Sequence, residues 1–311
     1  MAVNVYDIVT ERIIKELEKG NIPWHKPWIR PTTKYKTIKV EINPNECAYS
    51  RSTGKPYSFL NQMLLGIAGE WATYKQITEA GGQVRKGEKS SVCVFWKFNE
   101  VKTGKFNPDG TEIIEQVPCL RYYNVFHVAT QCEGIKPRDR KVFTEESIAD
   151  GKENTYEWDA IEAADEIVRN YLSRTGITLK EQIGDRAYYT PAFDSITTPA
   201  RSQFKDPAEF YSTLFHEMTH STGHRTRLNR FCDAAQFKFG SESYSKEELV
   251  AELGAAAMNN MLGIENAASF KNSAAYIQSW VSALKNDNKM IVSASSRAEK
   301  AVNYILSGEI A

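Results

Sequence analysis

The chain has 311 residues, 41% of them hydrophobic and 25% charged, and its 39 basic side chains balance its 39 acidic ones. This is the composition of a globular protein with enough residues for two cores, and it excludes a highly charged disordered chain. No run approaches 18 apolar residues, the first residues lack a basic and apolar leader, and the five cysteines are widely spaced without a Cys-x-x-Cys pair. We therefore expect a cytoplasmic protein with reduced thiols and no membrane span.

The even charge balance conceals two regions of opposite charge. Residues 19–105 carry 15 Lys or Arg against six Glu and no Asp, whereas residues 136–311 carry 25 acidic against 21 basic side chains. A polar, proline-containing stretch separates the two regions. We predict an α+β protein of two domains, a small mixed α/β module followed by a helix-rich module, divided as 1–135, a linker at 136–154, and 155–311.

In the first module, apolar residues at helical spacing from Val5 to Leu17 predict an opening helix that Gly20 ends. Further on, the β-branched and aromatic runs Ser91–Phe98 and Leu120–His127 predict two paired strands. The glycine-containing stretch Lys102–Lys105 predicts the hairpin turn near them.

Loops of the first module combine cations with aromatic rings. Cations can follow phosphates while ring faces stack on unpaired bases, so this combination favours single-stranded DNA as partner. The candidate residues are Trp24, Trp28, Arg30, Lys55, Tyr57, Arg85, Lys86 and Lys89. Any one aromatic, Phe95 and Trp96 especially, is more readily interpreted as sheet core. No zinc finger or clear helix-turn-helix is present.

The second module is predicted to open with an amphipathic helix from Trp158 to Leu172. Short strands are expected at Arg186–Tyr189 and Asp194–Thr197. Helices at Ala274–Lys285 and Ser296–Ser307 close the module, and both are expected to be purely structural.

The most informative motif is His216-Glu217-x-x-His220, which falls on a predicted helix with Asp206 as its N-cap. On such a helix the two imidazoles lie one turn apart on one side and can bind the same metal ion. Glu217 lies beside them, where its carboxylate can activate water without ligating the metal. The motif predicts a zinc-dependent hydrolase with one Zn²⁺ ion.

A third ligand must come from outside the motif. Thr226 stands where a metzincin would place its third histidine. His224 is an alternative ligand only if the helix continues past Gly223, a typical helix-ending residue.

A downstream helix supplies the better candidates. Ser245 and Glu248 form a capping box that predicts a helix from Ser245 to Leu262, and the small residues after Glu252 would allow it to pack closely against the motif helix. We favour Glu252 as the third ligand, with Glu248 as an outer partner that contacts one of the histidine ligands and orients its ring. The spacing leaves the reverse assignment open.

These residues suit peptide hydrolysis, with Glu217 as general base and an additional oxyanion donor from the unranked set Tyr189, Tyr211, His224 and Tyr244. A DNA-coating shield with a structural zinc site is the alternative, although such a site has no use for Glu217. A metal-dependent nuclease is disfavoured because nuclease metals prefer oxygen ligands.

Several motifs together resemble the ArdC antirestriction family, whose N-terminal module has relatives in plasmid TraC-type primases. The matching motifs are Tyr6-Asp7-x-Val9-Thr10, Pro23-Trp24, Pro27-Trp28, Lys55-Pro56-Tyr57 with Asn61, Phe215-His216-Glu217-x-x-His220-Ser221-Thr222-Gly223-His224, Arg227-Leu228, and Glu247-Glu248-Leu249-x-Ala251-Glu252-Leu253. The resemblance spans nearly the whole chain. It implies a plasmid-associated protein with an N-terminal single-stranded-DNA-binding domain and a C-terminal zincin-like metallopeptidase domain. It further implies protection of incoming conjugative DNA from host restriction, with a host protein as candidate substrate and the recipient cell as a candidate place of action.

Overall fold

The computed structural model describes residues 4–25, 47–106, 111–138, 156–204, 207–231, 242–264 and 274–308. Trp28, Arg30 and the expected N-cap Asp206 lie outside these residues.

The first module is built on a four-stranded sheet in the order β1-β2-β5-β4, in which β1 runs parallel to β2 and the other pairs are antiparallel. The expected opening helix is confirmed as α1, which ends at Glu18 just before Gly20. The elements in chain order are α1 (Val5–Glu18), the 3-10 turn η1 (Pro23–His25), β1 (Ala48–Ser50), α2 (Phe59–Leu65), β2 (Gly69–Ala72), α3 (Tyr74–Glu79), β3 (Gln83–Val84), β4 (Ser91–Phe106), β5 (Glu112–His127), α4 (Val128–Gln131) and β6 (Cys132–Glu133).

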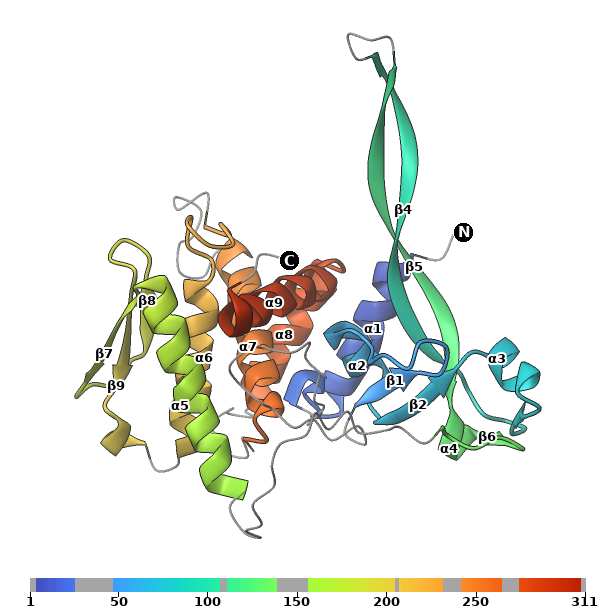
Figure 1. The fold of residues 1–311 in the computed structure, drawn as a ribbon, viewed down its shortest axis with the longest axis horizontal. Helices are drawn as coiled ribbons and strands as arrows, with labels where there is room; N and C mark the ends of the chain where they lie inside the picture. The colour runs from blue at the N-terminus through green and yellow to red at the C-terminus, as the bar shows by residue number, and fades with distance from the viewer. Residues whose placement is uncertain are drawn as a thin grey trace, which may run out of the picture.

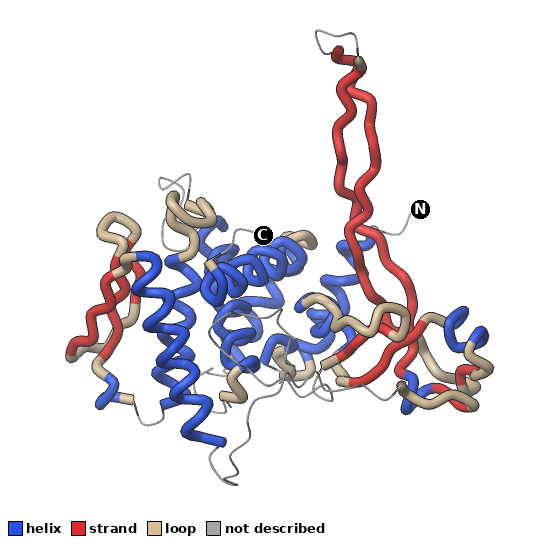
Figure 2. Tube along the Cα trace, in the orientation of Figure 1, coloured by secondary structure: helices blue, strands red, loops and turns tan. Residues whose placement is uncertain are grey.

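Strands β4 and β5 continue far beyond the sheet as a two-stranded ribbon that projects from the body (Figures 1 and 2). The prediction of a hairpin turn at Lys102–Lys105 is wrong, because these residues belong to β4. Gly104, with φ of 71°, instead lies where the strand register shifts between Lys102 and Phe106. Its positive φ therefore produces a local irregularity in the ladder rather than the chain reversal.

The second module combines a small three-stranded sheet, order β7-β9-β8, with a group of long helices. Its elements are α5 (Tyr156–Thr175), β7 (Thr178–Gln182), β8 (Tyr188–Thr190), β9 (Ser195–Pro199), η3 (Arg201–Gln203), α6 (Pro207–Ser221), α7 (Glu242–Met261), α8 (Ala274–Asn286) and α9 (Met290–Ser307). The expected helices are present, and two of the three strands were expected. The prediction that a capping box at Ser245 begins this helix is wrong, because α7 already begins at Glu242. None of the described helices is long and apolar enough to cross a membrane.

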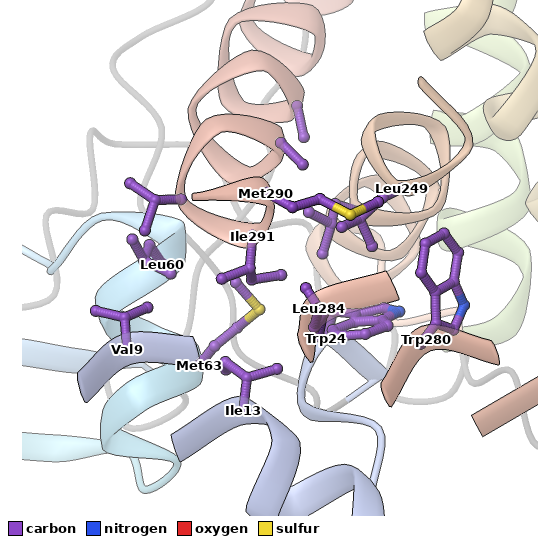
Figure 3. Packing of buried hydrophobic residues seen from close by; sticks show 14 of the residues in the cluster. Val9, Ile13, Trp24, Leu60, Met63, Leu249, Trp280, Leu284, Met290 and Ile291 are labelled. Atoms are coloured by element: carbon purple, nitrogen blue, oxygen red, sulfur yellow. The ribbon is translucent and has the colours of Figure 1, made fainter. Parts of the chain in front are cut away.

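The two modules share a hydrophobic core (Figure 3). Ile13 of α1 and Trp24 of η1 are buried in the same cluster as Leu249 of α7 and Trp280 of α8. The two indoles meet edge to face, with ring centroids 6.4 Å apart. The modules are therefore distinct in sequence but packed together at α7, α8 and α9.

A second cluster surrounds α6. Phe215 and Met218 are fully buried there among side chains of α5, α7 and α9, including Ile167, Met258 and Ile305. Helix α7 contributes to both clusters, so it packs against the first module on one side and against the motif helix on the other.

Candidate metal centre

The histidines of the motif and one carboxylate of α7 converge on a common point. The Nε2 atoms of His216 and His220 are 3.1 Å apart. Glu248 places one carboxylate oxygen 3.5 Å from Nε2 of His216 and the other 3.4 Å from Nε2 of His220. Tetrahedral zinc with bonds of about 2.0–2.1 Å holds its ligand atoms about 3.3–3.4 Å apart. The donor set therefore fits a zinc ion in both chemistry and spacing.

Of the two α7 carboxylates, the structure brings Glu248 rather than the favoured Glu252 to the imidazoles. Among the described residues, His216, His220 and Glu248 have ligand atoms that all lie within 4.8 Å of one another. Glu252 lies one turn further along α7 and is absent from this group. Burial would lower the pKa of His216, but contact with Glu248 outweighs it, and the nearby charges of Glu217 and Glu252 add to the rise.

Close packing of α6 and α7 brings the ligands together. A Cβ atom added to Gly254 would lie only 2.6 Å from the side chain of Thr219, inside the motif. Glycine therefore lets α7 approach α6 at this level, as the small residues after Glu252 led us to expect.

The carboxylates determine the charge state of the site in the absence of metal. Burial alone would lower the pKa of His220, but Glu247 and Glu248 outweigh it and raise that pKa to about 10. Glu247 lies 3.4 Å from Nδ1 of the His220 ring, opposite the side that faces Glu248. Burial would raise the pKa of Glu248, but its contacts with both imidazoles hold it well below the ordinary value. Without metal, the cluster at neutral pH is therefore a network of ionised carboxylates around the protonated His220 imidazole; we call it the ion network.

Arg230 holds this network in place through its ion pair with Glu247. Its guanidinium donates from Nε to the Glu247 carboxylate at 3.0 Å and also donates to the Thr222 hydroxyl at 2.7 Å and the Thr219 carbonyl at 2.8 Å. A single buried side chain thus joins the end of α6 to α7 and fixes the carboxylate that contacts His220. The sequence showed only a basic loop here, and neither Glu247 nor Arg230 was expected at the site.

Arg227 ties the same loop to the small sheet. It donates to the Ser221 carbonyl at 2.8 Å and to both carboxylate oxygens of Asp194, which has a left-handed φ of 46°. The Tyr189 hydroxyl donates to Asp194 at 2.6 Å and accepts from Arg227 at 3.1 Å. Tyr189 therefore belongs to a structural network that supports the end of α6.

The other proposed site residues are placed as follows. Glu217 is buried on α6, and its charge contributes to raising the pKa of both motif histidines. Tyr211 is buried in the second core. His224 lies beyond the end of α6, where its Nδ1 is 2.8 Å from the Thr226 hydroxyl, and it is not in the ligand group. The side chain of Tyr244 lies outside what the structure describes.

Among the described candidate DNA-binding residues, the cations are exposed and the aromatic rings are buried. The four cations Lys55, Arg85, Lys86 and Lys89 are exposed. Trp24 is fully buried against Trp280, so the prediction that its ring stacks on a base is wrong. Tyr57 is also buried, in a small cluster that includes Cys93, and burial raises its pKa well above the ordinary value. Neither ring presents a free face to a base.

The ribbon supplies exposed aromatics that sequence reasoning assigned to the core. Phe95 and Trp96 are 45% and 42% exposed, and Phe98, further out on β4, is 61% exposed. Ile114 and Tyr122 on β5 are exposed as well. The mismatch arises because strand patterning predicts a pleated surface but does not say whether anything covers it.

Comparisons with known proteins cover both modules. Residues 3–126 match a model of the N-terminal domain of the anti-restriction factor ArdC, and residues 163–297 match a zincin-like metallopeptidase model. The crystal structure of the antirestriction protein ArdC from plasmid R388, in its metal-free form, is 33% identical over 97% of each chain, with a TM-score of 0.65. The chain belongs to the ArdC antirestriction family.

Other relatives extend the picture. A Mn(II)-bound structure of the R388 protein is also 33% identical over 97% of each chain, with a TM-score of 0.64. A DNA primase TraC from Escherichia coli is 35% identical over 98% of this chain, and a second TraC is 36% identical over the same share. This chain spans only 20% and 27% of the length of those two primases.

Proposed function

We propose that this family member binds single-stranded DNA through its first module, hydrolyses peptide bonds at a zinc centre in its second, and protects incoming DNA from restriction. The observation that carries the proposal is the convergence of His216, His220 and Glu248 at 3.1–3.5 Å, with the buried Glu217 beside them on α6. Two imidazoles and one carboxylate would supply three protein ligands, the number that catalytic zinc sites use.

The chain's own residues have separable roles at this centre. His216, His220 and Glu248 would hold the ion, and Glu247 with Arg230 would orient the His220 ring. A bound zinc ion supplies Lewis acidity toward water and a substrate carbonyl. Glu217 accepts the proton of the attacking water and returns it to the departing amine. The Mn(II)-bound relative makes manganese the competing metal in any reconstitution.

Single-strand binding rests on the first module. Lys55, Arg85, Lys86 and Lys89 supply exposed positive charge, and Phe95, Trp96 and Phe98 supply exposed rings on one strand. Stacking of a base on such a ring contributes about 1–3 kcal/mol and does not depend on sequence. The chemistry suits entering DNA, whose sequence is not fixed in advance.

The deciding experiment compares wild type with Glu217→Ala in a cellular antirestriction assay at equal expression. Purified protein is tested in parallel for zinc content and for binding to an oligothymidine. We expect the variant to keep zinc and DNA binding but to lose hydrolysis and protection. Full protection by Glu217→Ala would remove proteolysis from the function and favour a shield that acts by coating DNA.

A further inference from the structure

Two cavities lie where the first module meets helix α9. The first has a volume of about 470 Å³ and is lined by Tyr6, Trp96, Lys246, Asp287, Lys289 and Arg297, among others; we call it the basic cavity. The second has a volume of about 460 Å³ and includes Lys55, Tyr57, Phe95, Trp96 and Tyr123; we call it the aromatic cavity. Each volume falls in the range of small-ligand sites.

The two cavities are neighbours. Trp96 of β4 and Val292 and Ser296 of α9 line both of them. The base of the ribbon and the N-terminal part of α9 therefore form a shared wall, with the basic cavity on one side and the aromatic cavity on the other. One elongated ligand can occupy both by passing over Trp96.

The lining chemistry differs between the two sides. In the basic cavity, Asp287 is the acidic side chain, and Lys246 neutralises it at 2.9 Å. Lys289 lies 5.6 Å from the centroid of the Tyr6 ring, and Arg297 makes no ion pair or hydrogen bond with any residue that the structure describes. Lys289 and Arg297 are both exposed, so their charges are available to an anion.

The aromatic cavity is suited to bases. Phe95, Trp96 and Tyr123 supply apolar ring surface, while the hydroxyl groups of Ser50 and Ser52 supply hydrogen-bond donors and acceptors. Lys55, one of the exposed cations of the first module, lines the same cavity. A nucleic acid strand presents a base and a phosphate at each successive nucleotide, so an aromatic cavity next to a basic one matches its chemistry.

We infer that a single DNA strand lies across Trp96, with bases in the aromatic cavity and a backbone phosphate in the basic cavity against Lys289 and Arg297. Part of the DNA site is then made by α9 and its N-cap Lys289, in the metallopeptidase module, although the sequence pattern predicts a purely structural helix there. The inference rests on the proposed single-strand binding and extends it to a second module. A nucleotide within a strand and a free mononucleotide share this chemistry, and the test separates them.

The test measures binding of fluorescent oligothymidine by the full chain over a range of salt concentrations, and binding of thymidine monophosphate in parallel. Variants are Lys289→Ala, Arg297→Ala and the double substitution. Each lost phosphate contact should weaken binding about tenfold at low salt. It should also reduce the slope of log affinity against log salt by about 0.7. The matched control is Lys300→Ala, an exposed cation on the same helix that lines neither cavity.

The outcomes are distinguishable. Weaker binding with a shallower salt slope in the double variant, and wild-type behaviour in Lys300→Ala, supports the inference. Unchanged binding and slope in the double variant, while wild type binds, overturns it and leaves the DNA site within the first module. Loss of thymidine monophosphate binding with unchanged oligothymidine binding also overturns it, because the cavity then takes a free nucleotide. Failure of wild type to bind the oligonucleotide would refute the proposed DNA binding itself.

Discussion

The candidate metal centre on α6 and α7 and the ribbon of β4 and β5 are held in place by opposite means. At the centre, a carboxylate and two imidazoles are fixed by a buried Arg230–Glu247 pair and by close helix packing at Gly254. The outer ribbon is held mainly by its own ladder and exposes Phe98 and Ile114 to solvent. Rigid buried polar groups suit chemistry that depends on ångström distances, whereas exposed rings suit a sequence-tolerant contact with a variable ligand.

If the centre depends on Arg230, removing that guanidinium should produce the largest loss of stability. Arg230→Met leaves the buried Glu247 carboxylate without its cation, which we expect to cost about 3–5 kcal/mol in the free energy of unfolding. Zinc affinity should fall about 10- to 100-fold, because His220 loses its orienting partner. Chemical denaturation and metal titration check both, and the exposed Arg225→Met is the control. Equal stability of the two variants would contradict the anchoring role.

Close packing of α6 and α7 predicts a smaller loss of stability when Gly254 is substituted. Gly254→Ala adds a methyl group 2.6 Å from Thr219, and we expect a loss of about 1–3 kcal/mol, although alanine is the better helix former by about 1 kcal/mol. Gly184→Ala is the matched control, because an added Cβ there meets open space. Thermal unfolding measures the difference. A stabilised Gly254→Ala protein would show that the helices tolerate greater separation.

Metal binding at neutral pH should release protons. The pKa of His220 is raised to about 10 in the metal-free site, so its ring is protonated at pH 7 and must lose that proton to bind metal. Calorimetry in buffers of different ionisation enthalpy should detect release of about one proton, which declines as the pH approaches 10. Apparent zinc affinity should rise over the same interval. Proton-independent binding at pH 7 would contradict the ion network.

The same shift predicts how the metal-free fold responds to pH. Because the folded pKa of His220 lies above its ordinary 6.5, the imidazolium–carboxylate contacts stabilise the fold fully below about pH 6.5. Their contribution is lost as the pH rises through about 10. Denaturation of the metal-free protein between pH 6.5 and 10 measures this, with the His220→Gln variant as reference. A flat difference between the two proteins across that interval would contradict the raised pKa.

On the ribbon we expect the smallest change in stability. Phe98→Thr should alter the free energy of unfolding by no more than about 0.5 kcal/mol, because the ring is 61% exposed. Val94→Thr, four residues earlier on the same face of β4 but buried, should cost about 1–3 kcal/mol. Phe98→Thr should nevertheless weaken oligothymidine binding if the ring stacks on a base. Strong destabilisation by Phe98→Thr would mean that the ribbon is packed rather than free.

The sequence predicts local geometry at the metal centre well, because His216 and His220 lie on one helix and helical spacing alone aligns their rings. It favours Glu252 over Glu248, whereas the structure places Glu248 beside the imidazoles. One helical turn separates the two carboxylates, and only the approach of α7 to α6 decides which of them reaches the imidazoles. Burial is the harder property to predict. Trp24 lies in a core shared between modules, whereas Phe95 and Trp96 are exposed, and those outcomes depend on contacts between distant segments.

The central claim is that His216, His220 and Glu248 form the metal centre. Zinc titration of the metal-stripped protein, compared among wild type, Glu248→Ala and Glu252→Ala, tests it most directly. We predict that Glu248→Ala loses tight one-to-one binding, while Glu252→Ala keeps it with affinity reduced about 10- to 100-fold. Tight binding by Glu248→Ala together with its loss in Glu252→Ala would contradict the assignment and restore Glu252 as the ligand.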